Sequence, residues 1–278
     1  MSLGQACVAF LVQTAFGSLL SFLLNDREAL GPKYFKFGGW VLVALYGLAA
    51  TLVVPAALGE SAPAFATATM FAVLAAGGGM LAFASVSGWD RPGLERACLG
   101  FAVLAAAAAV LFAALGTVPA DASTQHLALI LAAALVSSLV LGFSTWAMIL
   151  GHWYLTDHSL DIKHLGKLVR PLPWIFGLQL VVSSLAMWLL WERFLGPGVD
   201  DVDTLMLRHP ERVVDVVNLW ARLPVGALVP LVLSFMTLET VRLKKTQPAT
   251  GILYAMCVTV YMGDLMGKMV HSARGVPW

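Results

Sequence analysis

Long apolar stretches alternate with short polar segments along the whole chain. Eight of these stretches reach about 20 mostly apolar residues, the length that an α-helix needs to cross a bilayer. They fall at about residues 4–24, 37–58, 63–87, 94–117, 126–155, 171–195, 213–240 and 248–270. The pattern therefore predicts an all-α, polytopic integral membrane protein with about eight transmembrane helices.

The composition agrees with a chain that lies almost entirely within lipid. Of its 278 residues, 59% are hydrophobic and only 12% are charged, whereas a soluble domain carries roughly 25% charged residues. The turns leave no room for a soluble domain, so residues 1–278 are expected to form a single membrane domain. The net charge is +1 and there is no basic run, so no nucleic-acid partner is expected.

Lysine and arginine are distributed unevenly between the predicted loops. The loops after the first, third, fifth and seventh spans are basic, and those after the second and fourth spans have no basic residue. Basic loops stay in the cytoplasm of bacterial cells. We therefore expect a bacterial inner-membrane protein with both termini on the periplasmic side.

A weak internal similarity relates the two halves of the chain. Leu24-Asn25-Asp26 follows the first predicted span, and Leu155-Thr156-Asp157 follows the fifth. Two four-helix halves, 1–120 and 121–278, would then form a parallel repeat; chance similarity between apolar sequences is the alternative. In layout, the chain is similar to membrane subunits of the NrfD type in respiratory complexes.

The last predicted span carries a polar stripe at helical spacing. Its members follow at steps of three and four residues, which places them on one helix face: Tyr254, Cys257, Tyr261, Asp264, Lys268 and His271. Such a face is costly against lipid, so it should point toward other helices or a wet cavity. Tyr261, Asp264, Lys268 and His271, with Glu239 of the seventh span, are candidates for a proton path or polar stripe. The alternative is structural: an Asp264–Lys268 pair that satisfies itself, and a Glu239–Arg242 pair at the interface.

A second group of candidates lies at the cytoplasmic end of the fifth span. His152, Trp153 and Tyr154 combine a hydrogen-bonding ring with aromatic surface, which suits a quinone head group, although an aromatic belt at the membrane interface would look similar. Haem b ranks below a quinone as a cofactor because it needs two axial ligands at one depth. No catalytic or metal-binding residue is assigned.

These features favour a membrane subunit of a multi-protein respiratory or electron-transfer complex that interacts with the quinone pool and conducts protons. Other subunits and membrane lipid would be its partners, and the acidic loop 197–215 could dock an extracytoplasmic protein. Two alternatives remain open. One is a secondary transporter or channel, and the other is a structural or assembly subunit without chemistry of its own.

Overall fold

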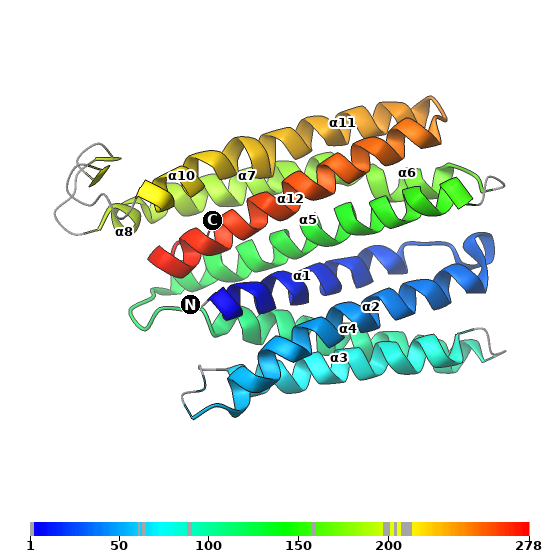
Figure 1. Ribbon diagram of the computed structural model, residues 1–278, viewed down its shortest axis with the longest axis horizontal. Coiled ribbons are helices and arrows are strands. Elements are labelled where there is room, and N and C mark those ends of the chain that lie inside the picture. Colours follow the sequence, from blue (N-terminus) through cyan, green and yellow to red (C-terminus); the bar gives the residue numbers. More distant parts are fainter. Residues whose placement is uncertain are drawn as a thin grey trace.

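Eight membrane-length helical segments build the protein. The computed structural model describes residues 3–60, 62, 65–87, 91–156, 160–196, 201–202, 205–206 and 213–277. Within these residues, eight helical segments are long and apolar enough to span a membrane, which confirms the predicted class. Both termini lie at the same end of the bundle (Figure 1), and this end is called the terminal end below.

The first four spans are single helices. They are α1 (Leu3–Leu23), α2 (Arg27–Leu58), α3 (Ala66–Val86) and α4 (Pro92–Leu115). The later spans include interruptions: α5 (Thr124–Thr156), α6 (Lys163–Val169) with α7 (Leu172–Leu189), α10 (Val213–Arg222) with η2 (Leu223–Leu228) and α11 (Val229–Arg242), and α12 (Thr246–Arg274). The short helix α8 (Trp191–Leu195) follows α7 at the terminal end (Figure 1).

Two spans begin earlier than the apolar pattern predicts. The helix predicted from residue 37 begins at Arg27, where the Asp26 side chain caps it by accepting the Glu28 N–H. Gly31, with a φ of 72°, kinks this first part of α2. The sixth span was predicted from residue 171, but its helical chain begins with α6. Hydropathy detects only the apolar part of a helix, so polar turns that extend it beyond the hydrocarbon are missed.

Helices α1 and α5 form the centre of the bundle. A Cβ atom on Gly17 would lie 1.7 Å from the carbonyl oxygen of Ser138, and one on Gly142 would lie 1.8 Å from the Gly17 carbonyl carbon. The two backbones therefore touch at this crossing, which only glycine permits. Helices α2, α4 and α12 also contact α1, so little of α1 faces the outside.

Each half of the chain forms a ring of four helices. In the first half the neighbours are α1 and α2, α2 and α3, α3 and α4, and α4 and α1. In the second half, α5, α7, α11 and α12 contact one another in the same cyclic order. The rings join mainly through α1 and α5. A sequence repeat between residues 1–120 and 121–278 stays a prediction.

The outer surface of the bundle is apolar. Trp174 is 83% exposed, Trp188 76% and Leu104 73%. A water-soluble protein rarely exposes large apolar patches of this kind, whereas lipid accepts them. The protein is therefore an integral membrane protein, and its polar chemistry must be sought inside the bundle.

Candidate functional site

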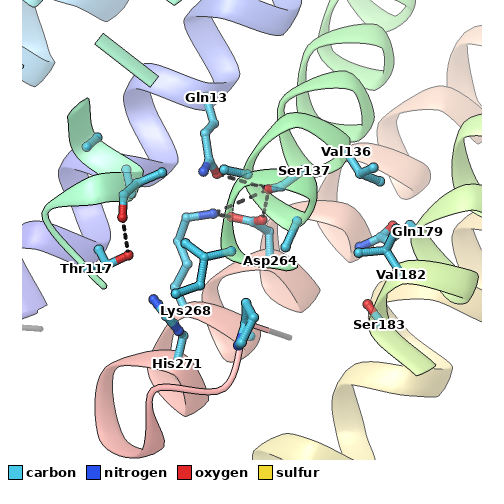
Figure 2. A pocket seen from close by; sticks show the side chains of 18 of the residues that line it. Gln13, Thr117, Val136, Ser137, Gln179, Val182, Ser183, Asp264, Lys268 and His271 are labelled. Atoms are coloured by element: carbon cyan, nitrogen blue, oxygen red, sulfur yellow. Dashed lines mark hydrogen bonds and ion pairs between the residues drawn. The ribbon is translucent and has the colours of Figure 1, made fainter. Parts of the chain in front are cut away.

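A cavity of about 60 Å³ with both polar and apolar lining lies between the helices, toward the terminal end, and Figure 2 shows it from close by. Its wall comes from α1, α4, α5, α7, α10 and α12 and is completed by Pro277 of the C-terminal segment. The space is enough for a few water molecules. The polar side chains that line it are Gln13, Thr117, Ser137, Gln179, Ser183, Arg222, Asp264, Lys268 and His271.

The charged part of this cavity lies deep in the bundle. Gln13, Arg222 and Asp264 each lie nine or ten positions inside the terminal end of their helical segments. At 1.5 Å per residue this is about 15 Å from the terminal ends of these helices. Side chains from separate spans thus meet at one depth, although they are far apart in the sequence.

Asp264 and Lys268 form the core of the cluster. Their side chains make an ion pair one helical turn apart on α12, and they are only 3% and 8% exposed. The Ser137 hydroxyl reaches both the Asp264 carboxylate and Gln13 Oε1, the latter at 3.0 Å, and can donate to one of them at a time. Lys268 Nζ lies 3.4 Å from Ser137 Oγ. Figure 2 shows this network linking α1, α5 and α12.

Arg222 is the third buried charge and is held differently. It is 5% exposed, and one of its terminal nitrogens donates to the Gly263 carbonyl at 3.1 Å. No carboxylate among the described residues forms an ion pair with it within 4.0 Å. Its guanidinium therefore enters the cavity with most of its N–H groups unengaged by the described protein.

A close crossing of two backbones brings Arg222 beside Asp264. A Cβ atom on Gly263 would lie 2.1 Å from the Cα of Gly226, so α12 and η2 touch without side chains between them. The wide π-helical turns of η2 follow Arg222 directly, and Val229 donates to the Pro224 carbonyl five residues earlier. Local π-helix occurs frequently at functional sites, since it re-aims the side chains on either side of it.

Two buried polar atoms of cavity-lining residues, one on α7 and one on α12, have no partner in the described protein. Gln179 is 5% exposed and Ser183 7%, and Figure 2 shows both on α7. Gln179 Oε1 and His271 Nδ1 are buried without a hydrogen-bond partner. Buried polar atoms are nearly always satisfied, and a cavity of this size offers room for water or a bound polar molecule to do so.

The predicted polar stripe divides into two parts. Asp264, Lys268 and His271 line the cavity, so this part of the face points into the bundle. Tyr261 lies outside the lining; its hydroxyl is 2.7 Å from Thr145 Oγ1. Glu239 is not brought to the cavity at all. It pairs with Arg242 at 2.5 Å on the exposed surface, and its position on α11 is about 25 Å from Arg222 along the helical segment.

His152, Trp153 and Tyr154 point in three directions and do not share one site. The exposed His152 has its Nδ1 3.1 Å from the Tyr254 hydroxyl. Trp153 packs edge-to-face against the ring of Tyr34. Tyr154 is buried, and its hydroxyl donates to the Asp161 carbonyl at 2.5 Å. The side chains of consecutive residues on a helix point about 100° apart, so these three neighbours in sequence contact different parts of the protein.

Several lining residues escaped the sequence reasoning. The sequence pattern selects none of Gln13, Ser137, Gln179, Ser183 or Arg222 as a candidate. Each of the first four is an uncharged polar residue in a long apolar segment, and three of them have a hydroxyl neighbour: Thr14, Ser138 and Ser184. This signal exists, but it also fits ordinary hydrogen bonding between packed helices, and only the fold shows that they converge.

Comparisons with protein-family models, with curated proteins and with solved structures found no match. No group of three or more His, Cys, Asp or Glu side chains among the described residues is arranged to hold a metal ion. Most of loop 197–215, the predicted docking segment, lies outside the described residues. The fold and the cavity together define an eight-span helical membrane protein with a charged internal site.

Proposed function

We propose that the protein is a secondary transporter or channel whose solute passes through the Arg222–Asp264–Lys268 cavity. The observation that carries this proposal is the convergence of three buried ionisable side chains inside the membrane-spanning bundle, among polar side chains from α1, α5 and α7. Ionisable groups within the membrane typically mark pathways for ions or substrates.

Energetics favour a transport role over a purely structural one. Each charged side chain at the centre of a spanning helix costs about 2.5–3.5 kcal/mol on insertion scales. A buried ion pair seldom stabilises a protein more than well-packed apolar residues of the same volume. A subunit with a purely structural role could fill this cavity with Leu and Ala. The buried charges therefore favour a cavity that binds a polar solute.

The seventh span offers a place for conformational change. Pro224 and Pro230 have no N–H to donate, which weakens the helical ladder around η2. Transporters commonly bind substrate where helices are interrupted near the midplane. Motion of α10 relative to α11 about η2 would move Arg222, and with it one wall of the cavity.

Transport ranks above the respiratory function that the sequence favours. A transporter needs enough polar groups within the membrane to form a substrate site. The cavity meets this need, because its polar lining comes from five helices, α1, α5, α7, α10 and α12, and from Thr117 in the turn after α4. With the basic loops placed in the cytoplasm of a bacterial inner membrane, the cavity lies in the periplasmic half.

The test is solute movement by the purified chain in liposomes. Currents or counterflow would be recorded for a panel of small ions and polar solutes, with Arg222→Gln as the site variant and Glu239→Gln as the surface control. We expect at least one solute to move, with Arg222→Gln reducing its rate tenfold or more and Glu239→Gln leaving it unchanged. Equal rates in all three proteins, or in protein-free liposomes, would refute the proposal.

A quinone site at His152 is the second candidate, favoured by one observation. The His152–Tyr254 pair lies on the exposed face between α5 and α12, where a lipid-dissolved quinone can reach it. Membership of an electron-transfer complex would follow from this site together with other redox subunits. Gentle purification followed by a reduced-minus-oxidised spectrum and mass spectrometry tests it. Co-purifying cytochrome or iron–sulfur subunits would support it, and a colourless protein that is stable alone would count against it.

A further inference from the structure

We infer that the cavity binds a small monovalent anion between the side chains of Arg222 and Lys268. This inference rests on the proposed transport function and names the substrate class for the same site. It follows from the charge of the cluster, from its hydrogen-bond donors and from the size of the cavity.

The charges of the cluster do not cancel. With all three side chains ionised, Arg222 and Lys268 contribute two positive charges and Asp264 contributes one negative charge, which leaves one positive charge buried in an apolar bundle. His271, which also lines the cavity, adds no negative charge in either protonation state. Isolated charge is costly in a low-dielectric interior, and one monovalent anion neutralises the cluster.

Two other cations at the terminal end, unlike Arg222, each pair with a carboxylate. Arg193 pairs with Asp121 at 2.8 Å, and Arg274 pairs with Asp215 at 2.6 Å. Among the buried basic residues that the structure describes, Lys268 has Asp264 as its partner, whereas Arg222 has only the Gly263 carbonyl. Arg222 therefore lies beside the Asp264–Lys268 pair without an ion-pair partner of its own among the described residues.

Hydrogen-bond donors are in excess around the cavity. A guanidinium has five N–H groups in a planar fork that suits oxyanions, and Arg222 uses one position on Gly263. The amide of Gln179 and the hydroxyl of Ser183 can add further donors from α7. Both Asp264 oxygens are already engaged, one by Ser137 and one by Lys268, so the carboxylate presents less negative charge to an incoming anion.

The size of the cavity suits a small anion. A space of about 60 Å³ holds a few water molecules. Chloride, nitrate and formate are of comparable size and could take the place of such waters.

The experiment measures anion binding to the full chain in detergent. Sodium chloride, nitrate and formate would each replace sodium gluconate, whose anion is larger, at constant pH and ionic strength, while thermal stability and binding heat are recorded. We expect saturable binding of at least one small anion, weakened tenfold or more in Arg222→Gln and unchanged in Arg242→Gln, an exposed cation. No saturable binding to the wild type, or equal binding to Arg222→Gln, would overturn the inference.

Asp264→Asn should change the anion affinity in the opposite direction to Arg222→Gln. This variant removes the one negative charge and keeps the shape of the side chain, so anion affinity should rise severalfold. A merely structural cluster predicts no gain, and weaker binding in a folded Asp264→Asn protein would contradict the inference. This variant also keeps the test decisive if Arg222→Gln fails to fold.

Failure of this inference can be distinguished from failure of transport. Anion binding without movement of any solute in liposomes would support the anion site and refute the transport proposal. Movement of a cation or neutral solute, with no binding of small anions, would support transport and refute the anion site.

Discussion

Breaking the buried ion pair should destabilise the protein more than removing it altogether. Lys268→Met removes one partner and leaves the Asp264 carboxylate, which is 3% exposed, facing only the Ser137 hydroxyl. Loss of one member of a buried pair typically costs about 3–5 kcal/mol. Arg222 lines the same cavity and offsets part of the lost charge, so we expect the lower value, about 3 kcal/mol.

The double variant Asp264→Leu/Lys268→Met provides the matched comparison. It leaves no unpaired carboxylate and fills the space with apolar atoms, but Arg222 stays buried without the neighbouring carboxylate, so its stability should lie above that of Lys268→Met and somewhat below that of the wild type. It should nevertheless fail to move solute, because only Arg222 of the three charged groups remains. Stability would therefore recover in part, and function would not.

Reversible unfolding in mixed micelles measures the free energies, and liposome flux measures function. A stable Lys268→Met single variant would show that the pair is hydrated and does not lie in a dehydrated interior. A double variant that still transports would show that the buried charges are not the solute site. Either result would refute the reasoning.

Three further predictions concern other parts of the chain. Gly263→Ala should cost about 1–3 kcal/mol by forcing α12 from η2, whereas Gly251→Ala, whose new Cβ would meet nothing within 4 Å, should not destabilise; melting temperatures compare them. The side-chain hydrogen bond from Arg193 lowers the pKa of Asp121, so the stabilisation from this pair is present at neutral pH and is lost as the carboxyl protonates below about pH 4. Asp121→Asn should thus lower the melting temperature more at pH 7 than at pH 3. If the quinone site operates, His152→Ala should reduce quinol-linked turnover while the protein remains inserted, and unchanged turnover would remove His152 from the mechanism.

The spans could be predicted because lipid imposes a simple rule on sequence. A helix within the hydrocarbon must be apolar over about 20 residues, and the pattern shows this directly. Hydropathy gives no signal where a helix extends beyond the hydrocarbon. The polar start of α2 at Arg27 and the segment α6 were therefore not predicted. The break at η2 was signalled only by Pro224 and Pro230, which also occur in many unbroken membrane helices.

The candidate site was only partly predictable. Helical spacing alone places Asp264, Lys268 and His271 on one face, and the cost of charge in lipid turns that face inward. The partners on other helices could not be found in this way, since the meeting of Ser137 with Gln13 depends on the backbone crossing of α1 and α5. Adjacency in the sequence does not bring Trp153 and Tyr154 into one site, because adjacent residues on a helix face different neighbours.

The most direct measurement of the central claim is solute flux through purified protein in liposomes, compared between the wild type and Arg222→Gln. The cavity account predicts wild-type movement of at least one small solute, with the rate reduced tenfold or more in Arg222→Gln and retained in Glu239→Gln. A folded Arg222→Gln protein that moves the same solute at the wild-type rate would contradict it.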